Sequence, residues 1–337
     1  MEQKILGSRK FYPLLFRQNS KTLVWGTEDW AVSAVRNSES VVDNGVWSGM
    51  KLPEVIAMHP VEMLGKAVAE RYNKELPLLT KIIDAHQDLS IQVHPDDEMA
   101  WREHNKSGKS EMWYILDAKP GACLYAGFKQ RITPIEYKKH VADGTITDVL
   151  AKHEVHVGDV FYLPAGRVHA ICGGIRLAEV QQSSDVTYRI YDYNRPGLDG
   201  KPRELHTELA AKAIDYTVYP EYKTEHRDDT DVAHKILNTP HFSVTVIEAT
   251  GSFHRNMLKY DSFIIMMNLK GNSYVRIRST QDSILLAEGD SCLIPAAIAD
   301  YNLIPIGSSA KVLEAFINNK KTIGKLISDF LHEQVLK

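Results

Sequence analysis

Residues 158–169 read GDVFYLPAGRVH, and residues 289–300 read GDSCLIPAAIAD. Both stretches follow the pattern Gly-Asp-x4-Pro-Ala, then a small residue, two more residues and a polar one, His169 or Asp300. Glycine and proline at this spacing favour a tight turn between two strands, so His169 should project from the second strand beside the turn. Because an internal repeat indicates a repeated structural unit, the chain is predicted to hold two copies of one β unit. Only the first copy keeps the histidine.

Short β-rich runs dominate between about residues 79 and 192, and the same pattern returns after residue 232. Their length, spacing and Gly/Pro punctuation predict antiparallel strands in a sandwich or barrel. The polar stretch 219–232 separates the two regions and is the best candidate for a linker. We therefore expect one domain at 1–218, with helical additions, and a second domain at 233–337.

Three segments carry helical patterns. Residues 59–73 place three apolar side chains on one face, which are those of Val61, Leu64 and Val68. Residues 133–144 begin with a threonine N-cap, a proline at the first helical position and a glutamate three residues after the threonine. Residues 320–336 show apolar side chains at helical spacing. The first two segments are predicted to be packing helices, and the third a C-terminal helix on the core.

The composition and charge of the chain restrict the classes of partner that it is expected to bind. With a formal charge of −3 over 337 residues, the protein has no bias toward nucleic acid or an anionic membrane. No apolar run approaches the ~18 residues that span a bilayer, and the first residues lack a signal-peptide pattern. Cys123, Cys172 and Cys292 are far apart, which fits reduced thiols better than a disulfide framework. We expect a cytoplasmic protein whose partner is a small molecule or another protein.

The run LSIQVHP holds Gln92 and His94 two residues apart in a strand, so both side chains should lie on one face. Two carboxylates could complete a metal site with them. Glu98 follows in DDEMAWREHN, which is typical of a helix start with acidic residues near its positive end. Glu111 instead opens a strand-like run and can point inward. Each polar residue alone is more often a surface residue, but together with His169 the set predicts a metal site.

The spacing Gly-x5-Pro-x-Gly-x2-His resembles the second conserved motif of the cupins, which are double-stranded β-helix barrels that hold a metal inside. Where cupins usually have an asparagine four residues after the histidine, this chain has Gly173. Cupins supply their other ligands as His-x-His followed by Glu, and Gln92 replaces the first of these histidines. The resemblance implies a mainly β fold of two cupin (jelly-roll) barrels with a few packing helices and a C-terminal helix. The second barrel, which ends its motif in Asp300, is expected to be metal-free.

Longer stretches resemble the class I mannose-6-phosphate isomerases, which are zinc-dependent and built from cupin barrels, and among them the short bacterial branch. The resemblance covers most of residues 21–216 and rests on PLLTKIIDAHQDLSIQVHPDDEMA, KSEMWYIL, LPAGRVHAI and EVQQSSDVTYRIYDYNR. It implies one Zn²⁺ per chain and a catalytic arginine at Arg189. The implied metal ligands are His94, Glu111 and His169, with Gln92 as a fourth group.

The implied reaction interconverts mannose 6-phosphate and fructose 6-phosphate through an enediol intermediate. A metal can polarise the oxygens at C1 and C2, and Arg189 can stabilise the charge that develops there. Phosphate recognition needs cations or hydroxyl donors, which Lys81, Ser90 and Lys109 offer on or beside the ligand-bearing strands. The chain is expected to act as a monomer or homodimer.

One segment departs from the family. Family members usually have a longer stretch between a Trp-Gly pair and a later Glu-x-Trp, whereas Trp25-Gly26 and Glu28-x-Trp30 almost touch here. In the family, the missing loop is expected to border the sugar pocket. The shortening motivates an alternative function, a non-catalytic cupin that binds a sugar phosphate as a sensor or scaffold. A second alternative is an iron-dependent cupin oxygenase, because a Gln/His/Glu/His set is compatible with several metals.

Overall fold

The computed structural model describes residues 11–319, which form three antiparallel sheets. The first sheet has six strands in the order β2 (Ser20–Leu23), β3 (Gly26–Val32), β4 (Leu78–Ala85), β11 (Ile175–Gln182), β6 (Glu111–Ala118) and β9 (Val160–Leu163). The second has five strands in the order β12 (Tyr188–Tyr191), β5 (Ile91–Val93), β10 (His169–Ile171), β7 (Cys123–Phe128) and β8 (Leu150–Glu154). The predicted mainly β fold with antiparallel strands is therefore confirmed.

The third sheet has eight strands and is built mainly from the C-terminal third of the described chain. Its central order is β1 (Leu14–Leu15), β18 (Ser291–Ile294), β16 (Ile264–Ile277), β19 (Asp300–Phe316), β14 (Ser243–Ala249) and β13 (Ala233–Asn238). Two further strands complete it, since β15 (Phe253–Asn256) pairs with β19 and β17 (Ser283–Leu286) pairs with β16. The N-terminal strand β1 thus pairs with β18, far from it in sequence.

Short helices surround the sheets. The α-helices are α1 (Leu52–Met58), α2 (Pro60–Leu64), α3 (Lys66–Arg71), α4 (Asp97–His104), α5 (Pro134–Ala142) and α6 (Thr207–Ala213). Single turns of 3-10 helix are η1 (Gly45–Trp47), η2 (Ile146–Val149), η3 (Leu258–Tyr260) and η4 (Ala296–Ile298). None of the helices within residues 11–319 has the length and apolar character needed to cross a membrane.

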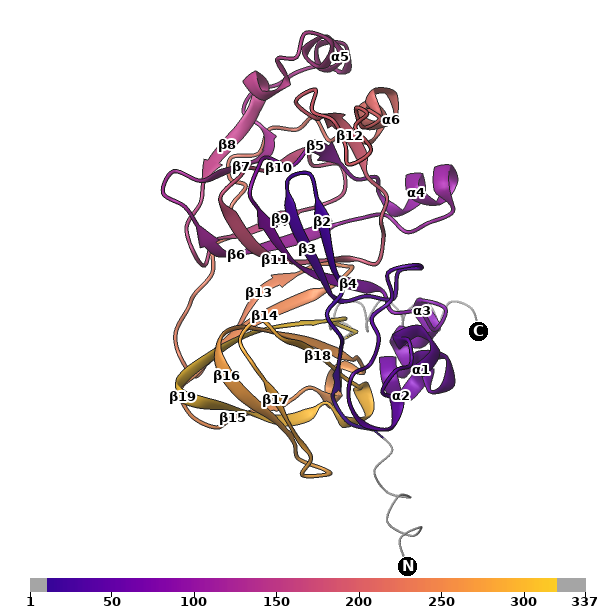
Figure 1. Cartoon of the computed structure of the whole chain (residues 1–337), viewed down its shortest axis with the longest axis vertical. Coiled ribbons are helices and arrows are strands. Elements are labelled where there is room, and N and C mark those ends of the chain that lie inside the picture. Colours follow the sequence, from indigo (N-terminus) through magenta and orange to yellow (C-terminus); the bar gives the residue numbers. More distant parts are fainter. Residues whose placement is uncertain (1–10, 320–337) are drawn as a thin grey trace, which may run out of the picture.

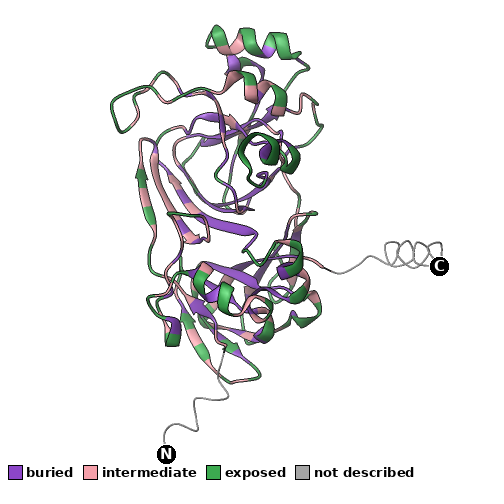
Figure 2. Ribbon diagram, turned by 90° about the vertical axis from the view of Figure 1, so that its right-hand side faces the viewer, coloured by how far each residue is buried: buried purple, intermediate pink, exposed green. Residues whose placement is uncertain are grey.

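The sheets and helices form successive layers (Figure 1). One apolar core lies between the six-stranded and five-stranded sheets, and the outer face of the five-stranded sheet packs beneath α5 and α6. Another core joins the six-stranded sheet, α1 to α3 and the eight-stranded sheet, which also encloses a core of its own. Figure 2 shows buried residues concentrated along the strands and exposed residues on helices and loops. The core between the six-stranded and five-stranded sheets therefore surrounds the candidate site.

The helical predictions had mixed outcomes. The helix at 133–144 is confirmed as α5, in which Thr133 and Glu136 form a reciprocal capping box. The prediction of a single helix at 59–73 was wrong. Gly65 divides the segment into α2 and α3, and Val61 is exposed. Gly65 has φ +90°, and a Cβ there would lie 2.1 Å from a backbone oxygen of Asp261, so only glycine fits. The predicted C-terminal helix lies outside the described residues.

The repeated motif folds in the same way in both copies. Gly158 has φ +91° and Gly289 has φ +89°, and each precedes an aspartate whose amide closes a turn. The motif then forms a strand, β9 or β18, and the chain turns after its proline into β10 or β19. His169 consequently begins β10, and Asp300 begins β19.

Candidate active site

Two rows of side chains, one from each sheet, organise the site. In the five-stranded sheet, Gln92 of β5 lies opposite Arg189 of β12 on one side and His169 of β10 on the other. Directly opposed residues of antiparallel strands share one face, so these three side chains are neighbours. His94 follows two residues after Gln92 on the same strand side. The alternation predicted for LSIQVHP therefore places His94 on the same face of the sheet as His169 of β10.

The candidate metal cluster is formed by His94, Glu111 and His169. Nε2 of His94 lies 3.2 Å from Oε1 of Glu111, and Nε2 of His169 lies 3.5 Å from Oε2. Atoms able to bind a metal, one from each residue, all lie within 4.8 Å of one another. The three side chains are each about 1% exposed. Glu98, the competing carboxylate, lies on α4 with its side chain 90% exposed, far from such an environment.

Hydrogen bonds set the orientation of both imidazoles. Nδ1 of His94 bonds to the carbonyl of Val186 at 2.9 Å, and Nδ1 of His169 bonds to the carbonyl of Arg167 at 2.8 Å. A carbonyl only accepts, so each Nδ1 carries the proton and each Nε2 turns a lone pair toward Glu111. Burial lowers the pKa of His94 to about 4 and also lowers the pKa of His169, which keeps both rings neutral.

This arrangement fits a divalent metal ion. Two lone pairs directed at an ionised carboxylate repel it unless a cation lies between them. Among the described residues, neither Nε2 atom nor Oε2 of Glu111 has a hydrogen-bond partner, although all three atoms are buried. Imidazole nitrogen and carboxylate oxygen are ligands that such ions accept, and the Nδ1 bonds are the usual supports of a metal-bound histidine.

Lys109 lies against the cluster. Its Nζ is 2.6 Å from Oε1 of Glu111. Burial alone would raise the pKa of Glu111, but the ammonium of Lys109 brings it well below its usual range. Glu111 is therefore ionised, which a metal ligand must be.

The six-stranded sheet contributes the second row. Glu179 of β11 lies opposite Lys81 of β4 and opposite Trp113 of β6. Its carboxylate is 3.1 Å from the Lys81 ammonium and accepts a hydrogen bond of 2.9 Å from the Trp113 indole. Glu28 approaches the same ammonium at 3.7 Å. Burial would lower the pKa of Lys81, but the two glutamates raise it above its usual range, so the lysine stays charged.

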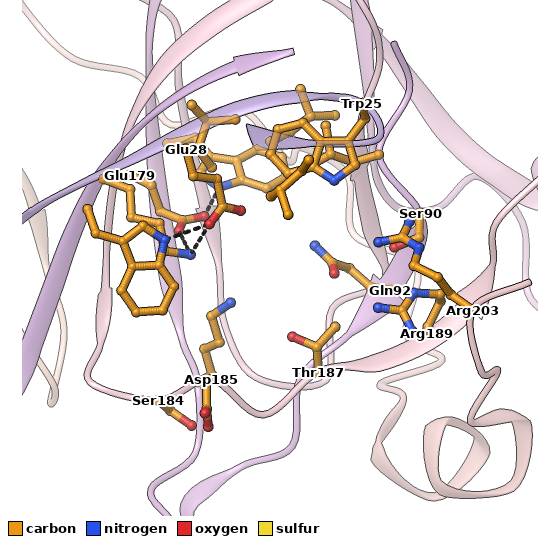
Figure 3. A pocket seen from close by; sticks show the side chains of 18 residues that line it. Trp25, Glu28, Ser90, Gln92, Glu179, Ser184, Asp185, Thr187, Arg189 and Arg203 are labelled. Atoms are coloured by element: carbon orange, nitrogen blue, oxygen red, sulfur yellow. Dashed lines mark hydrogen bonds and ion pairs between the residues drawn. The ribbon is translucent and has the colours of Figure 1, made fainter. Parts of the chain in front are cut away.

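A cavity of about 320 Å³ separates the two rows. The residues predicted from the sequence that line it are Lys81, Ser90, Gln92, Lys109 and Arg189. Figure 3 shows Arg189, Arg203 and Ser90 gathered on one side of the cavity, and Glu28 with Glu179 on the other. Two guanidinium groups, of which Arg203 already pairs with Asp192, thus lie opposite a lysine that has two carboxylate partners.

Arg189 occupies the arginine side of the cavity. One Nη donates to the carbonyl of Glu204 at 2.9 Å, and Nε has no hydrogen-bond partner within the described chain. Burial and the nearby charge of Arg203 lower the pKa of Arg189. A guanidinium remains protonated in proteins, so Arg189 keeps its charge and has donors to offer to a bound anion.

Several lining residues escaped the sequence prediction. Glu179 could have been found, because strand alternation places it inward with Leu177 in IRLAEVQQ, and a carboxylate on an apolar face is unusual. Arg203 lies in a loop, and no periodic pattern pointed to it. Trp25 and Glu28 come from the shortened segment, and both line the cavity.

Comparisons with known proteins agree on the family. Residues 19–126 match the family model described as phosphomannose isomerase type I, catalytic domain. The chain is 34% identical over 310 residues to the mannose-6-phosphate isomerase ManA of Bacillus subtilis, covering 86% of this chain and 95% of that one. It is also 34% identical over 278 residues to the mannose-6-phosphate isomerase of Streptococcus mutans, covering 81% and 84%.

A solved structure supports the same conclusion. The crystal structure of the mannose 6-phosphate isomerase from Bacillus subtilis superposes with a TM-score of 0.81 at 28% identity, covering 90% of this chain and 99% of that one. Since a relative 34% identical matches the chain along nearly its whole length, the chain belongs to the type I mannose-6-phosphate isomerase family.

Proposed function

We propose that the protein is an aldose–ketose isomerase that interconverts mannose 6-phosphate and fructose 6-phosphate. The observation that carries the proposal is a buried His94–Glu111–His169 cluster beside a cavity lined by arginine and serine, in a chain that belongs to this isomerase family. A sugar phosphate combines hydroxyls, a carbonyl and an anion, and the cavity offers partners for all three.

The metal is proposed to be Zn²⁺, one per chain, held by His94, Glu111 and His169 with Gln92 as a fourth group. Two imidazoles and a carboxylate are a common catalytic zinc set, which leaves a position open for substrate or water. When bound, such an ion polarises substrate oxygens. In the sheet, Gln92 lies between His169 and Arg189. As a fourth ligand, Gln92 would therefore also separate the metal from the arginine.

Roles in the reaction are proposed for the lining residues according to their charges. Arg189 is proposed to stabilise the negative charge that develops on the substrate oxygens in the enediol-like transition state. The phosphate is proposed to lie toward Arg203 and Ser90, beside the Arg189 guanidinium, which makes no ion pair with a carboxylate of the described residues. Lys81 and Lys109 are proposed to bind sugar hydroxyls, because carboxylates already neutralise both ammonium groups.

We further propose that the chain forms two cupin barrels, as the repeated motif suggests. The six- and five-stranded sheets around one core would form the first, residues 1–218, and the eight-stranded sheet around another would form the metal-free second, 233–337, with 219–232 as linker. The pairing of β1 with β18 adds an N-terminal strand to the second unit. The cytoplasmic location and the monomeric or homodimeric state stay predictions.

The test is one coupled assay with metal content measured on the same sample. Zinc-loaded protein should convert fructose 6-phosphate to mannose 6-phosphate, and activity should scale with zinc occupancy. Binding of fructose 6-phosphate without turnover would instead support the sensor or scaffold. Iron in protein purified without added metal, together with oxygen uptake, would support the oxygenase.

A further inference from the structure

Cys123 and Cys172 face each other across two strands of the five-stranded sheet. Strands β10 and β7 are antiparallel with Ile171 opposite Leu124, so the next pair along is Cys172 and Cys123. The amide of Cys172 donates to the carbonyl of Cys123 at 3.2 Å, which marks a hydrogen-bonded pair. Such pairs have Cα atoms about 5.5 Å apart, inside the range of about 4.4–6.8 Å that a disulfide spans. The side chains of the two cysteines also interact directly across the strands.

The two thiols lie on the outer face of the sheet. Ile171 and Leu124 belong to the core between the two sheets, and successive side chains alternate, so their neighbours Cys172 and Cys123 point the other way. Cys123 is 9% exposed and Cys172 is 8% exposed, so both lie close to the surface of the sheet while counting as buried. A bridge between them would therefore lie outside the cavity and leave the metal cluster in place.

The third cysteine lacks these features. Cys292 lies on β18 in the eight-stranded sheet and is fully buried. Burial raises the pKa of the Cys292 thiol and also that of Cys172, so what sets Cys292 apart is its place in another sheet, away from the other two cysteines. Cys123 interacts with the exposed Lys152, and Glu154 lies opposite it on β8. The chain thus contains one facing pair of cysteines and one separate cysteine that serves as an internal reference.

We propose that Cys123 and Cys172 form a redox-active dithiol, which a small-molecule disulfide such as glutathione disulfide oxidises to a cross-strand disulfide. The Cys123 thiolate attacks one sulfur of glutathione disulfide, forms a mixed disulfide and releases one glutathione. Cys172 loses its proton to water and attacks the Cys123 sulfur, which forms the Cys123–Cys172 bond and releases the second glutathione. The dithiol loses two electrons, and the small disulfide gains them.

The first experiment uses the full-length, metal-loaded protein. After incubation with glutathione disulfide, free thiols are alkylated and the protein is digested for mass spectrometry. Free thiols per chain should fall from three to one. The peptides that contain Cys123 and Cys172 should be recovered linked, with the mass of two hydrogens lost, and dithiothreitol should reverse the link. Recovery of both cysteines as free thiols, or as two separate glutathione adducts, would overturn the proposal.

Matched variants test whether the two thiols act together. Cys123→Ser and Cys172→Ser each remove one partner, so the remaining thiol should accumulate as a stable glutathione adduct that the wild-type protein resolves. Cys292→Ser should behave as the wild type. Equal adduct levels in the wild type and the single variants would show that the cysteines act independently. If circular dichroism shows that a variant does not fold, the wild-type peptide map decides alone.

Discussion

Replacement of Arg189 by alanine should abolish most turnover while leaving the metal bound. The guanidinium lines the cavity with its Nε unpartnered, and only one Nη is engaged by the Glu204 carbonyl. Loss of one preorganised donor to a developing oxyanion lowers kcat by about 10²–10³, or about 2.7–4 kcal/mol of transition-state stabilisation. Arg189→Lys should recover only part of this loss, because one ammonium cannot reproduce the fork of donors.

The assay couples mannose 6-phosphate formation to a chromogenic readout, and elemental analysis of the same sample reports metal per chain. Arg176→Ala is the control, since Arg176 is exposed on β11 and does not line the cavity. Its activity should stay within about twofold of wild type, as for substitutions away from a site. The reasoning is refuted if Arg189→Ala keeps near-normal kcat, or if it loses metal along with activity.

Three further predictions follow from the site. His169→Ala should lose metal and activity together, whereas Asp300→Ala should lose neither, as elemental analysis and the coupled assay will report. In metal-free protein, the folded pKa of His94, about 4, lies below its unfolded value. Stability is therefore complete above about pH 6.5 and should fall by up to about 3 kcal/mol toward pH 4, measured by urea unfolding. Trp113→Phe removes the indole donor to buried Glu179 and should destabilise the fold by about 1.5–3 kcal/mol.

Each of these predictions has a control. Metal retained by His169→Ala would remove that histidine from the ligand set. For the pH effect, His94→Gln should flatten the decline between pH 6.5 and 4, and an unchanged decline would assign it to other groups. For Trp113→Phe, the matched variant Trp101→Phe changes an exposed tryptophan and should leave stability unchanged, so equal effects would contradict the role of the buried hydrogen bond.

Local patterns predicted the parts of the fold that depend on neighbouring residues. The capping box of α5 needs only Thr133 and Glu136, and it formed as the sequence indicated. The break between α2 and α3 depends on Gly65 meeting Asp261, a residue nearly 200 positions later. Because that contact is tertiary, the apolar spacing of residues 59–73 predicted one helix where the chain forms two.

The same distinction holds for the site. Alternation within one strand was enough to group Ser90, Gln92 and His94, and the helix-start pattern was enough to separate Glu98 from the strand residue Glu111. The position of Glu179 beside Lys81 required the register of β11 against β4, which no single segment encodes. The pairing of two distant cysteines required the register of β10 against β7 for the same reason.

The repeated turn explains why metal chemistry should belong to one half of the chain. Both copies of the motif start a strand with a polar residue after the same Gly-Asp and Pro-Ala pairs. The turn therefore fixes where this residue lies and does not decide whether it binds a metal. In the first copy, His169 meets His94 and Glu111 inside a buried cluster. In the second, Asp300 lies 2.7 Å from His254 near the surface, and the guanidinium of Arg278 lies against that histidine. A cation beside the His254 imidazole repels a metal ion, so the second copy can keep the turn without keeping a metal.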